Sequence, residues 1–417
     1  LLVGLILLSA VFAEETKSVR ATRKWVKQNA HAILQDFTHL LSMPNVASNH
    51  KDIRNNAEYI SNLFQKRGFD MQLLELEGAN PIVYGEYKVS GAIRTLCFYV
   101  HYDGQPVDPT KWAHGPFNPV LYSGAMDKGG KQIALPARRD KIDPEWRIYG
   151  RSAGDDKAPI ITILNAVDAL QSSKIGFTSN IKLFFEGEEE AGSTNLKAHL
   201  LNNKNLLDDI DIWLFCDGPV HQSRRPQLVF GVRGVTGMEV TVYGATRALH
   251  SGHYGNWAPV PGQMLARLIA SMKNEDGKVL IENFYDTVEP LSEFERLELA
   301  KIPNVDMQLK NELGLVFTEG EGRTINERLL LPSLTIKGLA SGNVGKKARN
   351  VIPNTATTAI GVRLVKGNDP EDMLDKVESH IRKQGYHIVY TEPDIKTRLK
   401  YRKIAKVDRR GSGYIAS

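Results

Sequence analysis

The amino-acid sequence predicts an α/β fold: a three-layer αβα domain with a mostly parallel sheet, combined with a smaller α+β domain whose sheet is antiparallel. Three observations predict it. The chain has 417 residues, which is enough for two or three domains. In its first half, short apolar runs alternate with amphipathic segments of helical spacing, a pattern typical of parallel βα units. After about Arg225 strand patterns dominate, which favours an antiparallel sheet.

The first half opens with two predicted helices. Apolar residues recur at helical spacing over Lys24–Leu41, and Pro44 ends that helix. A second amphipathic helix covers Asn55–Arg67 and is closed by Gly68. The strands that follow are Met71–Leu76, Ile82–Tyr87 and Thr95–Val100, and an apolar helix is predicted at Ala158–Leu170.

The second half predicts the small α+β domain. Its strands are Leu228–Val235, Met238–Gly244, Leu334–Leu339, Thr357–Val365 and, as the last one, Tyr386–Tyr390; its helices are Gly262–Met272 and Asp369–Lys383. Residues 274–331 lack a regular pattern and are interpreted as a partly helical insertion. In the first half, the basic, glycine-rich segment 120–145 is predicted to form a surface loop.

Composition and charge exclude several classes of protein. Apolar residues make up 42% and charged residues 24%, as in ordinary soluble proteins. The net charge is +5, but the basic residues are scattered, so we expect a solvated surface and no nucleic-acid partner. Cys97 and Cys216 each lie in an apolar run. Two buried core thiols are the favoured interpretation, and a cross-strand disulfide is the alternative.

Residues 1–13 are apolar and end in small residues, which predicts part of a signal peptide. The stretch is too short to span a bilayer, which takes about 20 apolar residues. A buried N-terminal helix or strand is the alternative. We therefore expect an exported protein, periplasmic or extracellular, without a stable membrane anchor.

Four acidic or histidine-bearing motifs each follow a short apolar run that is predicted to be a buried strand. The runs are Thr95–Val100, Trp146–Tyr149, Ile181–Phe185 and Ile212–Cys216, and the motifs behind them are His101–Asp103, Ala153–Lys157, Glu188–Ser193 and Asp217–Pro219. Ligand sites in open α/β sheets form at the carboxyl ends of parallel strands, so we expect these motifs to meet at one edge. Carboxylates gathered there need cations to offset their repulsion, which points to a metallohydrolase.

Each motif alone also has an ordinary explanation. His101 and Asp103 point the same way on an extended segment, as an imidazole and its orienting carboxylate would, but such pairs are common in surface loops. Asp155 suits a helix cap, and a glutamate run suits a solvated loop. Asp217 would be a buried carboxylate, which is rare without a partner. The coincidence of all four favours a site.

Taken together, the motifs resemble those of the co-catalytic zinc peptidases related to carnosinase, glutamate carboxypeptidase and aminoacylase. The matching segments are His101–Pro106, Tyr149–Lys157, Glu186–Ser193, Cys216–Gly218, His250–Gly252, Asn350–Pro353 and Val362–Val365. The resemblance implies a catalytic domain at residues 22–224 with two divalent cations. It also implies a lid domain at residues 226–394, which in such proteins often forms a homodimer.

By motif position, the resemblance implies four metal ligands. Asp155 matches the carboxylate that bridges both cations, His101 and Asp217 match ligands of one cation, and Glu190 matches a ligand of the other. Mixed histidine and carboxylate ligation suits Zn²⁺, with Mn²⁺ or Co²⁺ as substitutes.

Four further residues gain a role from the same resemblance. Glu189 matches the general base, and Asp103 matches the carboxylate that orients the metal-bound histidine. In the lid, His250 matches a histidine that reaches an active site, often that of a partner subunit. Arg363 matches an arginine that grips a substrate carboxylate.

One departure from the family pattern stands out. The resemblance predicts a further histidine ligand near the C-terminus, yet no histidine follows His387. We therefore expect a chain truncated at its C-terminus, in which residues 395–417 begin the return to the catalytic domain.

The predicted reaction is hydrolysis of the amide bond in dipeptides or short peptides that carry a free C-terminal carboxylate. A water activated by the two cations attacks, and Glu189 moves the proton. Two alternatives stay open. An N-acyl-amino-acid amidohydrolase would use the same centre, and a non-catalytic metal- or peptide-binding relative is favoured only by the absent histidine.

Overall fold

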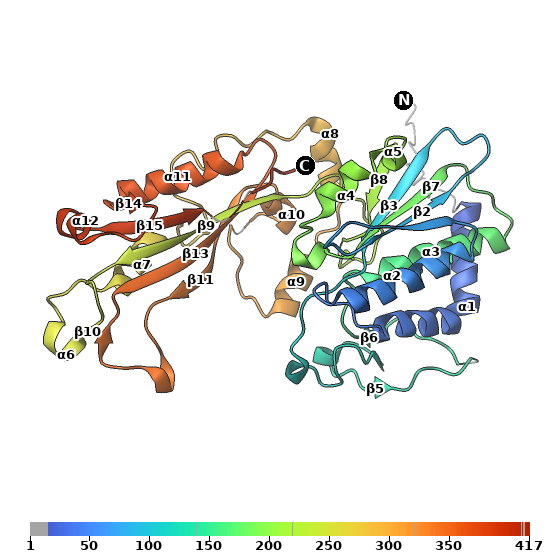
Figure 1. Ribbon diagram of the computed structural model, residues 1–417, viewed down its shortest axis with the longest axis horizontal. Helices are drawn as coiled ribbons and strands as arrows, with labels where there is room; N and C mark the ends of the chain where they lie inside the picture. Colours follow the sequence, from blue (N-terminus) through green and yellow to red (C-terminus); the bar gives the residue numbers. More distant parts are fainter. Residues whose placement is uncertain (1–15, 139, 219, 321, 410, 412) are drawn as a thin grey trace, which may run out of the picture. The chain divides into compact units, whose positions relative to one another are not determined.

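The computed structural model describes residues 16–138, 140–218, 220–320, 322–409, 411 and 413–417. The chain forms two compact units, residues 1–219 and 220–417, and each is described by itself (Figure 1). The predicted signal peptide at residues 1–13 lies outside the described residues. Among the helices of the described part, none is long and apolar enough to cross a membrane.

The sheet of the first unit is mixed. Its order is β1 (Asp70–Leu74), β2 (Ile82–Tyr87), β7 (Asn180–Glu186), β3 (Thr95–His101) and β8 (Ile212–Phe215). The β7–β3 and β3–β8 pairings are parallel, whereas β1–β2 and β2–β7 are antiparallel. The expectation of a mostly parallel sheet therefore holds only for the three strands that precede acidic motifs.

Helices cover both faces of this sheet, which confirms the three-layer fold class. α1 (Lys17–Ser42), α2 (His50–Gln65) and α3 (Lys157–Ser172) pack on one face, and α4 (Leu196–Asn202) and α5 (Lys204–Leu207) supply apolar residues to the other. Successive strand residues point to opposite faces, so Phe185 joins the first core and Phe184 the second. Both rings are fully buried.

Local caps explain where the first two helices begin. α1 starts at Lys17, earlier than predicted, because the Thr16 side chain accepts a hydrogen bond from the Val19 N–H. α2 also starts earlier than predicted, since Asn49 caps it through the Asp52 N–H. Gly68 follows α2 with φ +88°, a backbone conformation that glycine adopts without steric cost.

The run Trp146–Tyr149, predicted as a strand of the main sheet, belongs to a separate small sheet. β6 (Arg147–Tyr149) pairs antiparallel with β4 (Val120–Tyr122), which also pairs with β5 (Gln132–Ile133). β4 and β5 lie within the segment 120–145 that was predicted to form a surface loop, and β6 lies just after it. The segment also holds the 3₁₀ turn η2 (Met126–Lys128) and follows η1 (Pro109–Lys111). β6 has only three residues, all half-buried, and is too short to cross the buried main sheet. It pairs with β4 instead.

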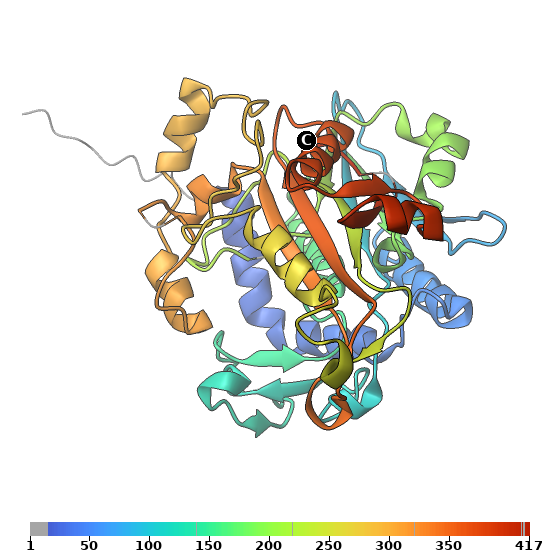
Figure 2. The ribbon, with the colours of Figure 1, turned by 90° about the vertical axis from the view of Figure 1, so that its left-hand side faces the viewer.

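The second unit is an α+β fold around a five-stranded sheet. Its order is β11 (Ser333–Ala340), β13 (Thr355–Leu364), β9 (Gly234–Tyr243), β15 (Ile404–Arg409) and β14 (His387–Val389). Every pairing is antiparallel except β15–β14. α7 (Pro261–Ala270) and α11 (Pro370–Lys383) cross one face of the sheet (Figure 2), and residues such as Leu268 and Val377 bury the core beneath them.

The remaining elements of this unit are short. They are β10 (Leu249–His250), β12 (Val351–Ile352), α6 (Ser251–Tyr254), α8 (Glu293–Ala300), α9 (Asp306–Leu313), α10 (Ile325–Leu329), α12 (Ile395–Lys400) and the 3₁₀ turn η4 (Gly345–Lys347). α8, α9 and α10 lie in the segment that was interpreted as a partly helical insertion.

Two strand predictions for the second unit were wrong. Strands were expected at residues 228–235 and 238–244, but the structure has a single strand there, β9, and residues 228–233 are irregular. Gly237 lies inside β9, where a Cβ atom would meet the Ile360 carbonyl oxygen at 2.6 Å. Residues 386–390 do not form the last strand, because β15 follows and lies between β14 and β9. Part of the segment 395–417, expected to return to the catalytic domain, therefore completes this sheet instead.

Candidate metal centre

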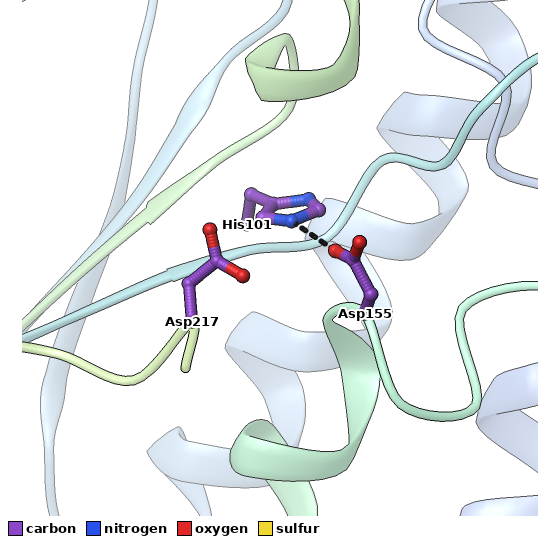
Figure 3. Close-up of side chains that lie close together, drawn as sticks. All are labelled: His101, Asp155 and Asp217. Atoms are coloured by element: carbon purple, nitrogen blue, oxygen red, sulfur yellow. Dashed lines mark hydrogen bonds and ion pairs between the residues drawn. The ribbon is translucent and has the colours of Figure 1, made fainter. Parts of the chain in front are cut away.

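Three of the predicted ligands come together at the edge of the first unit's sheet. One donor atom each from His101, Asp155 and Asp217 lies within 4.8 Å of the other two. Figure 3 shows the two carboxylates on either side of the imidazole. His101 is the last residue of β3, Asp155 lies in the turn before α3, and Asp217 follows β8. Segments far apart in the sequence thus present one imidazole and two carboxylates to the same point.

His101 is the fixed member of this group. It ends β3 and is fully buried. Its Nε2 atom lies 2.7 Å from Oδ1 of Asp155, and its Nδ1 atom faces Oδ1 of Asp103 at 3.4 Å. Its backbone N–H donates to Oδ2 of Asp156 over 3.3 Å. Carboxylates therefore contact both ring nitrogens and hold the orientation of the imidazole.

Asp103 links the histidine segment to the glutamate loop. The side chain is fully buried, and its two oxygens accept hydrogen bonds from the backbone N–H groups of Glu189 at 3.1 Å and Glu190 at 3.0 Å. These residues begin the 3₁₀ turn η3 (Glu189–Ala191). One buried carboxylate therefore orients His101 and fixes the start of the loop that carries the predicted base.

The two aspartates of the cluster are exposed. Asp155 lies in the turn before α3, joined to the buried Asp156 by a cis peptide bond. Asp217 follows β8 and is exposed, not buried as predicted. The reason is that β8 is an edge strand of the described sheet, with Phe215 68% exposed.

The two cysteines are free thiols; Cys97 is buried and Cys216 half-buried.

The carboxylates shift the proton affinity of the whole cluster. Burial lowers the pKa of His101, but contact with Asp103 and the negative charges of Asp103, Asp156 and Glu189 outweigh it and raise that pKa to about 10. Burial raises the pKa of Asp156 to about 8. It also raises the pKa of Asp217 and of Glu189, and each of these is partly opposed by the charge of His101.

This donor set fits a divalent cation. An imidazole nitrogen and two carboxylate oxygens are ligands that Zn²⁺ and Mn²⁺ accept. In the metal-free state a proton on His101 offsets part of the negative charge, as the raised pKa of His101 indicates. A cation at the same point would offset more of it. His101, Asp155 and Asp217 are therefore the residues that would hold one metal ion.

The two glutamates behind the cluster differ in their surroundings. The Glu189 side chain is 38% exposed, and its Oε2 atom lies 3.9 Å from Nε2 of His101. Glu190 accepts a hydrogen bond from the side-chain amide of Gln105 and is not among the three clustered donors. The positions are consistent with separate tasks for the two neighbours, and their roles stay predictions.

His250 and Arg363 belong to the second unit. His250 ends β10, is exposed, and accepts a hydrogen bond on Nδ1 from the Gly252 N–H at 3.1 Å. Arg363 is an exposed residue of β13. Its positive charge lowers the pKa of the neighbouring Arg233, after the larger effect of burial. Their predicted contacts with substrate stay predictions.

Sequence reasoning missed the residues that support the ligand segments. Glu188 has a structural role in the glutamate loop, because its carboxylate accepts hydrogen bonds from the Asn80 N–H and the Asn195 side chain. Asn80 and Asn45 are buried and bond to backbone groups of these loops. Asparagines in loops are common, so no sequence signal distinguished these two from turn residues.

Comparison with known proteins identifies related peptidases. Residues 230–389 match the M20 peptidase dimerisation domain. The chain is 26% identical to the Cys-Gly metallodipeptidase of Schizosaccharomyces pombe over 78% of its length, and 27% identical to the Beta-Ala-His dipeptidase of Mus musculus over 72%. The alignments cover 67% and 58% of these enzymes, so the chain spans about two thirds or less of their length.

Solved structures show the same fold. An M20 family metallo-carboxypeptidase from Sulfolobus solfataricus is 29% identical, with a TM-score of 0.66 over 85% of this chain and 76% of that protein. Human carnosine dipeptidase 1 superposes with a TM-score of 0.70 over 96% of this chain and 81% of its own. At 21% identity, the human structure supports the fold alone.

Proposed function

We propose that the chain is a metallopeptidase of the M20 type, to which it is similar by sequence and by fold, and that it hydrolyses the peptide bond of dipeptides in a metal-dependent reaction. The observation that carries the proposal is the convergence of His101, Asp155 and Asp217 on one point, with Glu189 beside them. A surface cluster of acidic residues would not need a buried histidine held between carboxylates.

The chemistry follows from the donor set. His101, Asp155 and Asp217 would hold a divalent cation, which would supply Lewis acidity and lower the pKa of a water molecule at the site to about 7. Glu189 is the candidate base that takes a proton from the attacking water and later passes it to the leaving amine. Burial raises the pKa of Glu189, which brings the carboxylate closer to the pH at which such a base works best.

We extend the proposal to two cations, with Zn²⁺ as the first choice and Mn²⁺ or Co²⁺ as substitutes. Asp155 would bridge them, and Glu190 would be a ligand of the second. In the second unit, Arg363 would bind the substrate's free carboxylate and His250 would contact the reacting carbonyl group. The match to a dimerisation domain supports a homodimer through this unit.

The relatives support dipeptides as the substrate class. Two of them carry names that specify a dipeptide, Cys-Gly and Beta-Ala-His. Export to a periplasm or the extracellular space, proposed from residues 1–13, would suit the scavenging of short peptides. The side chains that the site prefers are left to the assay below.

A substrate panel tests the proposal. The protein expressed from its complete gene, loaded with Zn²⁺ or Mn²⁺, is assayed with Cys-Gly, β-Ala-His and other dipeptides beside N-acetyl amino acids. The proposal predicts turnover of at least one dipeptide and its loss in a Glu189→Gln control. Preferential hydrolysis of N-acetyl amino acids would identify a deacylase. Full metal loading without turnover of any compound would identify a non-catalytic relative.

A further inference from the structure

We infer that Asn45 is a positioning residue that ties the segment carrying His101 to the turn carrying Asp155, and so sets the spacing of two donors in the candidate metal centre. Asn45 lies on the α1–α2 linker, residues 43–49, which contributes none of the predicted ligands. The inference rests on the proposed function only in requiring that the centre binds a cation. It does not depend on which bond the protein cleaves.

The side-chain amide of Asn45 contacts both ligand segments at once. It is fully buried, and Nδ2 donates to the Tyr102 carbonyl oxygen at 2.8 Å and to Oγ of Ser152 at 2.9 Å. Tyr102 stands between His101 and Asp103, and Ser152 stands three residues before Asp155. Both amide hydrogens are thus used, one on each segment.

The linker itself is held by contacts that do not involve this side chain. The buried Lys157 Nζ donates to the Leu40 carbonyl at 2.8 Å and to the Met43 carbonyl at 2.9 Å. The backbone carbonyl of Asn45 accepts from the Gly104 N–H at 2.8 Å, and Val46 pairs with Gly104 in a parallel bridge. Truncating the Asn45 side chain should therefore leave the linker in place and remove only the two hydrogen bonds from its amide to Tyr102 and Ser152.

The conformation of Ser152 is supported by its hydrogen bond from the Asn45 amide. It is buried and has φ +62°, a left-handed conformation that residues other than glycine seldom adopt. The opposite segment approaches so closely that a Cβ atom on Gly104 would lie 2.5 Å from the Ser152 Oγ. When the amide of Asn45 is lost, this hydroxyl loses its donor, and one of the contacts that hold the turn leading to Asp155 against the His101 segment is removed.

The test compares two buried asparagines of the same region. Asn56 is also fully buried, and its Nδ2 donates to the Pro44 carbonyl of the linker at 2.8 Å and to the Asp52 carbonyl at 2.8 Å, neither of which belongs to a ligand segment. Zn²⁺ affinity of the full-length protein is measured by competition with a chromophoric chelator, and thermal unfolding is measured without metal. Asn45→Ala should lower Zn²⁺ affinity about 10- to 100-fold, as loss of supporting contacts does at other metal sites.

The control fixes the interpretation. Asn56→Ala should lower the unfolding temperature but leave Zn²⁺ affinity within about twofold of wild type, since it supports no ligand segment. Equal losses of affinity in both variants, or wild-type affinity in Asn45→Ala, would overturn the inference.

A second variant covers the case in which Asn45→Ala does not fold. Ser152→Ala removes one acceptor of the Asn45 amide and keeps the other, so it should lower Zn²⁺ affinity by a smaller factor. Unchanged affinity there would overturn the inference as well. A wild-type protein that binds Zn²⁺ but hydrolyses no dipeptide contradicts the proposed function and leaves this test intact, whereas one that binds no Zn²⁺ overturns both.

Discussion

The Nε2 atom of His101 lies 2.7 Å from Oδ1 of Asp155, while Nδ1 of the same ring faces a second, buried carboxylate, that of Asp103. In the metal-free protein, a proton on Nε2 holds the first contact together. A cation that binds His101 takes the place of this proton, so metal binding and protonation compete for one nitrogen atom.

This competition predicts that metal affinity rises with pH. The surrounding carboxylates raise the pKa of His101 to about 10, so the imidazole is protonated at pH 7, and a cation must displace that proton. Between about pH 7 and pH 10 the affinity should increase roughly tenfold per pH unit for one displaced proton. Calorimetric titration in buffers of different ionisation enthalpy measures the proton released. An affinity that does not change over this range would contradict the assignment of His101.

Lys157 predicts a different dependence on pH, in the stability of the metal-free protein. Burial lowers the pKa of this lysine from 10.5 to about 7. Because the folded-state pKa is depressed, the cost to stability is absent above pH 10.5 and grows as the pH falls toward 7, reaching on the order of 5 kcal/mol. Urea unfolding of wild type and Lys157→Met should show that the variant gains relative stability as the pH falls across this window. A constant difference between the two would refute the prediction.

Glu189 should be needed for turnover and not for metal binding. Its carboxylate lies beside the cluster, and a general base typically contributes a factor of about 10² to 10⁴ in rate. Glu189→Gln should lower kcat by that factor while the bound metal per chain stays at the wild-type value. Glu190→Gln is the matched control and should instead lower the metal content. Loss of metal in the Glu189 variant would remove it from the role of base.

Asp103 should act through His101 and the glutamate loop. The Asp103→Asn change places an amide where two backbone N–H groups and an imidazole need acceptors, so metal affinity should fall about 10- to 100-fold. Glu186→Gln is a suitable control, because Glu186 is a buried carboxylate paired in register with His101 but bonded to the Tyr99 hydroxyl. A larger loss of affinity in the control would contradict the role given to Asp103.

The sequence was sufficient to predict the strands that lead into the site. β3 and β7 are apolar, buried and followed by chemistry-bearing residues, so periodicity and the strand-end rule located His101 and Glu189 together. The same rule placed Asp155 correctly near them for the wrong reason. Its preceding run forms β6 in a separate sheet, and Asp155 reaches the cluster from the turn before α3.

The rest required tertiary contacts that no local pattern encodes. β15 was missed because its polar, basic sequence resembles a solvated segment, whereas pairing with β9 and β14 buries Ile404 and Val407. The exposure of Asp217 depends on β8 lying at an edge of the described sheet, which periodicity within the strand cannot reveal. The supporting role of Asn45 depends on two segments that lie 57 and 107 residues away in the sequence.

The most direct test of the account is the rate of dipeptide hydrolysis as Zn²⁺ or Mn²⁺ is added back to metal-depleted, full-length protein. The account predicts no hydrolysis without metal, a rate that rises to a plateau as the site fills, and no recovery in a His101→Ala variant at the same metal concentration. Hydrolysis that persists without metal, or that recovers equally in the His101 variant, would contradict a metal centre built on His101, Asp155 and Asp217.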